Sequence, residues 1–310
     1  MPAANFMSAR LIINADDFGL TAGINRAIAE LHDAGAITSA TLMADGSEFL
    51  GAVEIARARP SLSVGCHIVL VDGMPISAPE DIPTLIGADG KSFRVSLAEF
   101  VIDALLGRIR ETDVLRETAA QVQKLQRAGI DITHLDTHKH THLFPVIARP
   151  LLHVAERCSI GAVRNPFEQP WSMQGGMLRQ LQVHALRYFH SQFFSLPQIR
   201  SGVVTTTEGT IGISATGNLN PATLARTLAS MPEGTWELVC HPGYNDEDLE
   251  LAPTRLREER NIERLTLLDA AQKFSQPNPP QFIHYGQLGV YSVKRELGQY
   301  ILPTGYEKVL

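Results

Sequence analysis

The sequence predicts an α/β protein: a (β/α) barrel of the TIM type, distorted or incomplete, with seven or eight strands. Short apolar runs rich in β-branched residues alternate with segments whose apolar residues recur at helical spacing. Polar clusters follow several of the apolar runs directly, and no linker, repeat or low-complexity tract divides the 310 residues. A doubly wound open sheet is the alternative, because a sequence does not show whether a parallel sheet closes on itself.

The first part of the chain sets this alternating pattern. Residues 10–17 form a short apolar run and are expected to be a buried strand. Residues 22–34 are expected to form a helix between Thr21, a suitable N-cap, and Gly35, which ends it. The pattern continues with an expected strand over 39–44, a helix over 47–59 and a strand over 63–69.

Two stretches interrupt the alternation within what is expected to be a single domain over 1–310. Residues 72–95 are rich in Gly, Pro and Asp and predict a long loop, which in compact domains is often functional. Residues 165–202 predict an irregular helical insertion. Elsewhere helices are expected over 97–109, 111–128, 146–157, 221–230 and 253–273, and strands over 132–137, 161–164, 235–240 and 281–285.

The composition excludes several classes of protein. Hydrophobic residues make up 44% and charged residues 19% of the chain, as in ordinary globular proteins. The net charge of −6 argues against a nucleic-acid partner, because proteins that bind nucleic acid usually carry a basic excess.

No run approaches the roughly 20 apolar residues that span a bilayer, and no signal peptide is recognised. A cytoplasmic location is therefore expected, with peripheral membrane association left open. Homodimerisation is compatible with the frequency of dimers among such proteins.

The first polar cluster, Asn14-Ala-Asp16-Asp17-Phe18-Gly19, follows the first predicted strand. Functional residues of parallel α/β folds gather at the carboxyl ends of the strands. Adjacent carboxylates point to opposite faces of a regular strand, but a turn at its end can bring both to one centre. A metal ion would let both stay ionised. The alternative is a turn capped by Asp17, with Asp16 solvated.

The second and third clusters contribute histidines. His67 lies at the end of a predicted strand, where a single histidine is more often structural. The third cluster, His134-Leu-Asp136-Thr-His138-Lys-His140-Thr-His142, has polar residues at every second position. If it is extended, four histidines and one aspartate share one side of the chain. Imidazole is a common ligand of zinc, so this pattern favours a metal site over an adventitious histidine-rich tract.

The fourth cluster is Glu237-Leu-Val-Cys240-His241-Pro242-Gly243. Pro and Gly force a turn that leaves His241 at the tip of a predicted strand. An ordinary imidazole titrates near neutrality and is suited to proton donation, whereas a purely structural strand-end histidine is the alternative. The sequence has no zinc-finger cysteine spacing, phosphate-binding loop or nucleophile elbow. Together the four clusters predict one metal centre, with Asp16 and His241 beside it.

These residues resemble the YdjC-like carbohydrate deacetylase family, which includes chitooligosaccharide deacetylases. Within that family, Val69-Leu-Val-Asp-Gly73 and His138-Lys-His140 are most similar to the branch associated with hopanoid biosynthesis. Cys66 stands where a hydrophobic residue such as Leu is expected. The matching pieces occur in the order of the family and run over most of the chain: Asn14 to Gly19, Gly65-Cys-His67, His134 to His142, Val163-Arg164 and Glu237 to Gly243.

The resemblance implies a barrel-like fold, one divalent metal ion and hydrolytic removal of acetate from an N-acetylated amino sugar. The sugar would be an oligosaccharide or a lipid-linked N-acetylglucosamine. Mg²⁺ or Zn²⁺ is the expected ion, with Mn²⁺, Co²⁺ and Ni²⁺ as alternatives. By position, Asp17, His67 and His138 would bind the ion, with His140 and His142 as substitutes for His138.

The resemblance also implies roles for three further residues. Asp16 would be the general base, His241 the general acid, and Arg164 would either support the site or contact the substrate. Two other functions are alternatives: another metal-dependent barrel hydrolase, such as a phosphoesterase or amidohydrolase, and a non-catalytic sugar-binding protein. The presence of Asp16 and His241 together argues against the second, because binding alone needs neither an acid nor a base.

Overall fold

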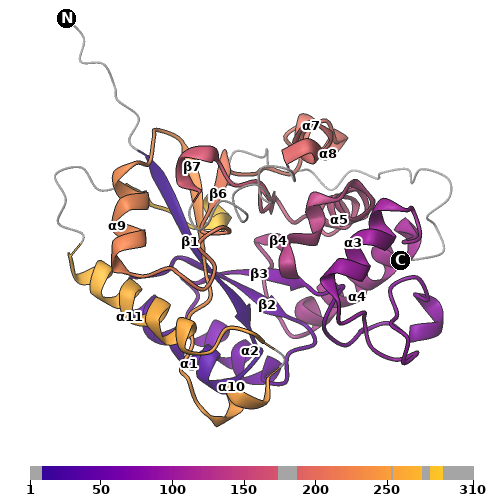
Figure 1. Cartoon of the computed structure of the whole chain (residues 1–310), viewed down its shortest axis with the longest axis horizontal. Helices are drawn as coiled ribbons and strands as arrows, with labels where there is room; N and C mark the ends of the chain where they lie inside the picture. The colour runs from indigo at the N-terminus through magenta and orange to yellow at the C-terminus, as the bar shows by residue number, and fades with distance from the viewer. Residues whose placement is uncertain (1–8, 174–186, 253, 274–279, 289–310) are drawn as a thin grey trace, which may run out of the picture.

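A single parallel sheet forms the centre of the molecule. The computed structural model describes residues 9–173, 187–252, 254–273 and 280–288 (Figure 1). Within these residues the strand order is β5-β4-β3-β2-β1-β7-β6, and β8 pairs with the beginning of β1. The strands are β1 (Arg10–Phe18), β2 (Ser39–Met43), β3 (Ser63–Ile68), β4 (His134–Thr137), β5 (Ala162–Val163), β6 (Gly209–Ile211), β7 (Thr235–Cys240) and β8 (Gln281–Phe282).

The two edges of this sheet meet. Thr205, just before β6, forms a parallel bridge with Ala162 of β5. Glu168, just after β5, forms a second parallel bridge with Thr210 of β6. The sheet therefore curls into a distorted barrel with an irregular seam, which confirms the predicted fold class over the open-sheet alternative.

Helices cover the outside of the curled sheet (Figure 1). Thr21 caps the first of them, as predicted, because its hydroxyl accepts a hydrogen bond from the N–H of Ile24 at 3.2 Å. Within the described ranges, no helix is long and apolar enough to cross a membrane. The longer helices are α1 (Ala22–Asp33), α2 (Phe49–Ala58), α3 (Leu97–Leu105), α4 (Glu111–Arg127), α5 (Pro145–Arg157), α9 (Pro221–Ala229) and α11 (Glu258–Lys273).

Two features differ from the sequence prediction, and part of a third lies outside the described residues. Strand β6 was not predicted, because three residues that begin with glycine give no apolar run. The helix expected over 253–273 starts at Glu258, and the short helix α10 (Glu247–Leu251) precedes it. Part of the expected insertion, residues 174–186, lies outside the described residues. The described parts of 165–202 contain short helices: η3 (Pro170–Ser172), η4 (Arg187–Phe189), α7 (His190–Phe194) and α8 (Pro197–Arg200).

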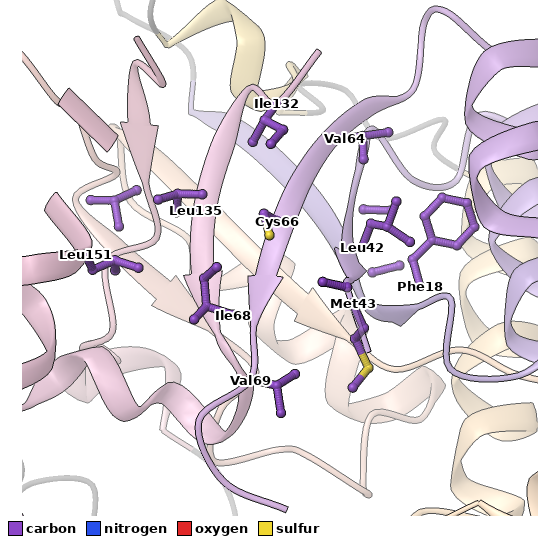
Figure 2. Packing of buried hydrophobic residues seen from close by; sticks show 14 of the residues in the cluster. Phe18, Leu42, Met43, Val64, Cys66, Ile68, Val69, Ile132, Leu135 and Leu151 are labelled. Carbon is purple, nitrogen blue, oxygen red and sulfur yellow. The ribbon is translucent and has the colours of Figure 1, made fainter. Parts of the chain in front are cut away.

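The outward faces of the strands build the main hydrophobic core against the helices. Alternation along β1 sends Leu11 and Ile13 into this core. Leu42 of β2 is in register with Cys66 of β3, which is in register with Leu135 of β4 (Figure 2). All three are fully buried, so Cys66 serves as a small apolar residue in this row.

The inward faces of the strands are apolar at one end and polar at the other. Ile12 of β1 packs in a small separate cluster with Ala162, Ile283 and Tyr285. This cluster fills the interior near the start of β1, where β8 also pairs. Further along the strands the interior side chains are polar or charged and buried: Asn14, Asp16, Thr41, His67, His134, Asp136, Arg164 and Glu237. The fold therefore concentrates buried charge toward the carboxyl ends of its strands.

Candidate metal centre

A backbone turn at the end of β1 brings two adjacent carboxylates to one centre. Asp17 has a left-handed backbone with φ of 63°, and the pairing of β1 with β2 shifts register between Ala15 and Phe18. Asp16 and Asp17 are 2% and 3% exposed, and both line the same cavity. The strict alternation of a regular strand is broken here, so neighbouring side chains share one face.

Asp17 meets two histidines that come from neighbouring strands. His67 lies on β3, and His138 follows the last residue of β4. Asp17 Oδ1 lies 3.6 Å from His67 Nε2 and 3.6 Å from His138 Nδ1, and the two ring nitrogens are 3.3 Å apart. Ligands about 2.0–2.1 Å from a tetrahedral ion lie about 3.4 Å from one another, so these three atoms have the spacing of a metal site.

The bonding of Asp17 leaves one oxygen for a ligand. Its Oδ2 accepts a hydrogen bond from Arg260 Nη2 at 2.6 Å. Its Oδ1 is buried and has no hydrogen-bond partner in the described part of the chain. A buried carboxylate oxygen without a partner is costly, and a cation would satisfy it.

His67 is oriented by a second carboxylate. Its Nδ1–H donates to Asp136 Oδ1 at 2.8 Å, which leaves Nε2 to face Asp17 and His138. Metal-binding histidines commonly hold their other ring nitrogen in this way. Burial alone would lower the pKa of His67, but Asp136, Asp16 and Asp17 outweigh it and raise the pKa to about 9. The site therefore favours positive charge at this position, and its residues fit a divalent metal ion.

A second cluster of possible donors shares His67 but is already occupied by protein. Asp16 and Asp136 lie close enough to His67 to form a three-residue group. Both carboxylates are ion-paired with Arg164, at 2.6 Å and 2.7 Å. In the group of Asp17, His67 and His138, the donor oxygen of Asp17 is not ion-paired with an arginine, so this group is the better candidate for the metal site.

Arg164 is a buried support of the site. Its side chain is completely buried, and its guanidinium contacts three carboxylates: Asp16, Asp136 and, at 2.8 Å, Glu237. It is absent from the described residues that line the cavity. Burial alone would raise the pKa of Asp16, but Arg164 outweighs it and holds this pKa well below its usual range. Of the two roles that the sequence left open, this placement favours support over substrate contact.

His241 stands at the tip of β7, where the sequence placed it. Its Nε2 lies 3.8 Å from Asp16 Oδ2. Its backbone N–H donates to Glu263 Oε2 at 2.6 Å, which fixes the start of the His-Pro-Gly turn. Burial lowers the pKa of His241 to about 4, so the ring is neutral near pH 7. The ring lines the cavity and faces the carboxylates of β1.

The expected extended run through the third cluster ends earlier than predicted. Strand β4 stops at Thr137, and Lys139 and His140 both adopt left-handed backbone conformations. The alternation prediction is therefore wrong beyond Thr137. The turn places His138 beside Asp17, whereas His140 lines the same cavity without joining the donor group of Asp17, His67 and His138.

The remaining two histidines of the cluster have structural contacts. His134 stacks on Tyr285 with ring centroids 3.7 Å apart and donates to Asn14 Oδ1 at 3.2 Å. A Cβ atom at Gly65 would lie 2.5 Å from the His134 ring, which explains the glycine there. His142 donates to the backbone oxygen of Arg164 at 3.1 Å and is fully buried. His142 is therefore turned away from Asp17 and His67.

The proposed centre opens into a cavity of about 1090 Å³. Polar groups from the ends of β1, β3, β4 and β7 lie at the metal site. An apolar part is formed by Leu97 and Val101 of α3 together with Leu143, Phe167, Ile213 and Leu256. The volume is at the upper end of the range of cavities that bind small organic molecules.

Two buried residues of α11 contribute to the site and were missed in the sequence. Arg260 and Glu263 are each 1% exposed, and they contact Asp17 and the backbone of His241. They lie three residues apart on one helical face, with buried Leu267 one turn further on. That spacing is a weak signal, because α11 also carries charged residues that are exposed or half-buried, such as Glu258 and Glu259.

The free energy of unfolding of the Glu263→Gln variant is expected to rise relative to that of the wild type as the pH increases. Burial raises the pKa of Glu263 from 4.5 to about 7. Between these values the folded chain keeps a proton that the unfolded chain has lost, so the wild type loses stability as pH increases. Gln avoids this loss, so the difference in free energy of unfolding should grow by about 2–3 kcal/mol between about pH 5 and pH 8.

Chemical denaturation of both metal-depleted proteins at each pH measures this difference. Glu263 also accepts a hydrogen bond from the N–H of Gly217, and Gln loses one of the two acceptors. That cost is the same at every pH and does not alter the trend. A difference that stays constant from pH 5 to pH 8 would show that Glu263 is ionised at an ordinary pKa.

Comparisons with known proteins give the family of this chain. The YdjC-like protein family model matches residues 10–274. A relative from Brevibacillus brevis, named carbohydrate deacetylase, is 31% identical over 283 residues, which cover 90% of this chain and 100% of that protein. A relative of the same name from Thermoanaerobacter pseudethanolicus is 26% identical over 262 residues, covering 84% and 90%.

A solved structure has the same fold. It comes from Enterococcus faecalis V583 and is described as a candidate cellobiose-phosphate cleavage protein. It matches with a TM-score of 0.74 and 23% identity, over 91% of this chain and 99% of that one. Since the family model spans most of the chain and a relative above 30% identity matches along its whole length, this chain belongs to the YdjC-like protein family.

Proposed function

We propose that this protein is a metal-dependent carbohydrate deacetylase that removes the acetyl group from an N-acetylated amino sugar. The observation that carries the proposal is the meeting of three donor atoms, from Asp17, His67 and His138, beside Asp16 and His241 in one cavity. The relatives named carbohydrate deacetylase support the choice of a sugar and an acetyl group. The substrate would be an oligosaccharide or a lipid-linked N-acetylglucosamine.

Asp17, His67 and His138 would hold the metal ion. When bound, a divalent ion there would lower the pKa of water and polarise the acyl carbonyl. Two imidazoles and one carboxylate are typical ligands of Zn²⁺ and also suit Mn²⁺, Co²⁺ and Ni²⁺, whereas Mg²⁺ prefers oxygen ligands. Arg260 occupies the second oxygen of Asp17, so this carboxylate would bind through Oδ1 alone.

Asp16 and His241 would carry the proton from water to the leaving amine. Arg164 keeps Asp16 ionised, so its carboxylate is ready to accept the proton of the attacking water. A carboxylate paired with arginine is a weak base and releases that proton readily. His241 is neutral near pH 7, and its Nε2 lies 3.8 Å from Asp16 Oδ2. We expect His241 to take the proton and donate it to the amine nitrogen.

Acetate release tests this function directly. Protein purified without chelator is expected to contain about one divalent ion per chain and to release acetate from N-acetylglucosamine oligomers or from a glycolipid bearing that sugar. A chelator should abolish the release, and added Zn²⁺ or Mn²⁺ should restore it. Metal analysis by mass spectrometry and an enzymatic acetate assay measure both quantities.

The other two functions give different results in the same assay. Phosphate release from a sugar phosphate, without acetate from any acetylated sugar, would indicate a phosphoesterase. Saturable sugar binding without release of acetate under any of the metals would indicate a binding protein. Either result would overturn the proposed deacetylation.

A further inference from the structure

Two arginine side chains are almost completely buried near the proposed metal centre, and their bonding differs. Arg164 is 0% and Arg260 is 1% exposed. Every nitrogen of the Arg164 guanidinium contacts a carboxylate: Nε bonds Glu237, while Nη1 and Nη2 both bond Asp16. Such complete pairing is expected of a buried charge whose role is to hold neighbouring groups.

Among the described residues, Arg260 forms hydrogen bonds through one of its three guanidinium nitrogens. Nη2 donates to Asp17 Oδ2 at 2.6 Å and to Thr254 Oγ1 at 3.1 Å. Nη1 and Nε are buried and have no hydrogen-bond partner among the described residues. Buried N–H groups are almost always paired, and exceptions call for a ligand or a water. Arg260 also lines the cavity, whereas Arg164 is absent from its described lining, so a molecule bound in the cavity would lie next to the Arg260 side chain.

The position of Arg260 indicates which part of a substrate it would meet. It bonds one oxygen of Asp17, while the other oxygen of Asp17 faces His67 and His138. The unpaired donors therefore lie beside the centre where the acyl group must react. A guanidinium matches carbonyl and carboxylate oxygens, because its N–H groups are coplanar and always charged.

The His-Pro-Gly turn holds the stem of this arginine. The N–H of Gly243 donates to the backbone oxygen of Arg260 at 3.2 Å. A Cβ atom at residue 243 would lie 3.2 Å from Arg260 Cδ and 3.3 Å from its Cβ, closer than most Cβ contacts. Glycine there lets the turn that carries His241 pack directly on the arginine. Arg260 and His241 are thereby fixed relative to each other.

From this geometry we infer that Arg260 is a further catalytic residue, whose Nη1 and Nε bind the acyl oxygen during hydrolysis and then the acetate product. The inference rests on the proposed deacetylation. Water adds its oxygen to the acyl carbon, and the C–N bond breaks with its electron pair going to nitrogen. One water proton goes to the amine, and the acetic acid formed releases its remaining proton. Negative charge on the acyl oxygen develops beside Arg260, where N–H donors stabilise it.

Arg260→Lys tests the role of the unpaired donors. Lysine keeps a positive charge for Asp17 but lacks the Nη1 and Nε groups. We expect kcat to fall by about 100-fold or more, with a smaller change in KM and about one metal ion per chain retained. Acetate should inhibit the variant at least about 10-fold more weakly than the wild type. Arg255→Lys is the matched control, because Arg255 lines the same cavity but is exposed, and it should leave acetate inhibition unchanged.

Acetate binding to metal-depleted protein separates this role from support of Asp17. Titration calorimetry should show binding to the wild type and to Arg255→Lys, and loss of binding in Arg260→Lys. Equal acetate binding or inhibition in Arg260→Lys and wild type would overturn the inference. So would full recovery of kcat in Arg260→Lys at high metal concentration, because the arginine would then act only through Asp17.

A crystal structure of the wild type with acetate avoids dependence on the folding of a variant. An acetate oxygen is expected within hydrogen-bond distance of Arg260 Nη1 or Nε. Acetate bound only elsewhere, at concentrations above its inhibition constant, would overturn the inference. If the wild type releases acetate from no sugar, the proposed function fails. The catalytic role of Arg260 then fails with it, whereas carboxylate binding by the wild type and its loss in Arg260→Lys would still show that Arg260 binds a carboxylate.

Discussion

Asp16→Asn is expected to lower kcat by about 100-fold or more while the protein keeps its metal ion. The amide cannot accept the proton that the attacking water must lose. Arg164 retains Asp136 and Glu237 as ion-pair partners in this variant, so the folded site should persist. The three donor atoms of Asp17, His67 and His138 are unchanged. The rate of acetate release gives kcat, and metal analysis of the same preparation gives the number of metal ions per chain.

Asp131→Asn is the matched control for this substitution. It makes the same chemical change at an exposed carboxylate that precedes β4, at the opposite end of the strand from the cavity. Its kcat and metal content should equal those of the wild type. Activity of Asp16→Asn within about threefold of wild type would show that Asp16 is not the base, since general bases typically contribute 100-fold or more.

Asp17→Asn is expected to weaken metal binding by more than about 100-fold, and activity should fall with it. Asp17 Oδ1 is the one carboxylate oxygen that faces both histidines and has no hydrogen-bond partner within the described ranges. An amide oxygen carries no full charge, and the substitution also leaves Arg260 without its carboxylate. Titration of metal-depleted protein with Zn²⁺ or Mn²⁺ measures the affinity.

The contrast between the two substitutions tests the division of roles. Asp17→Asn should lose metal, and excess ion should restore part of its activity. Asp16→Asn should keep metal, and excess ion should restore nothing. If both variants lose metal equally and both regain activity with added ion, Asp16 is a ligand rather than the base.

The convergence of strand ends was predictable from the sequence because parallel strands place their carboxyl ends at one edge. This argument alone places Asp16, Asp17, His67 and His241 at one end of the sheet. It needed only the apolar runs and the polar residues that follow them. The sequence also predicts that the alternation must break near Asp17 if Asp16 and Asp17 share one centre, because two adjacent carboxylates need a turn to lie on one face.

The histidine cluster shows where the sequence argument fails. The spacing alone does not distinguish His138, His140 and His142 as metal ligands, because in an extended chain all three would share one side. The left-handed conformations of Lys139 and His140 turn the chain after β4. The sequence has no glycine or proline at these two positions that would predict a turn. His134 and His142 then take structural contacts that depend on distant residues such as Tyr285.

The buried charged residues of α11 are the second feature that the sequence does not predict. Arg260 and Glu263 look the same in the sequence as the less buried charged residues of α11, such as Glu258 and Glu259. Their burial follows from the way this helix packs on the His-Pro-Gly turn, through the contact between Gly243 and Arg260. Tertiary packing of this kind leaves only a weak local signal, the spacing of Arg260 and Glu263 on one helical face. Arg164 was identified by the family resemblance, but its three carboxylate partners became visible only in the fold.

The position of the metal ion tests the central claim most directly. Crystals of the wild type soaked with Mn²⁺ or Zn²⁺ should show one strong anomalous diffraction peak at the carboxyl ends of the strands. We predict that this peak lies within bonding distance of Asp17 Oδ1, His67 Nε2 and His138 Nδ1. A peak bound instead by Asp16 and Asp136, or by His140, or no peak in the cavity at saturating ion, would contradict the account.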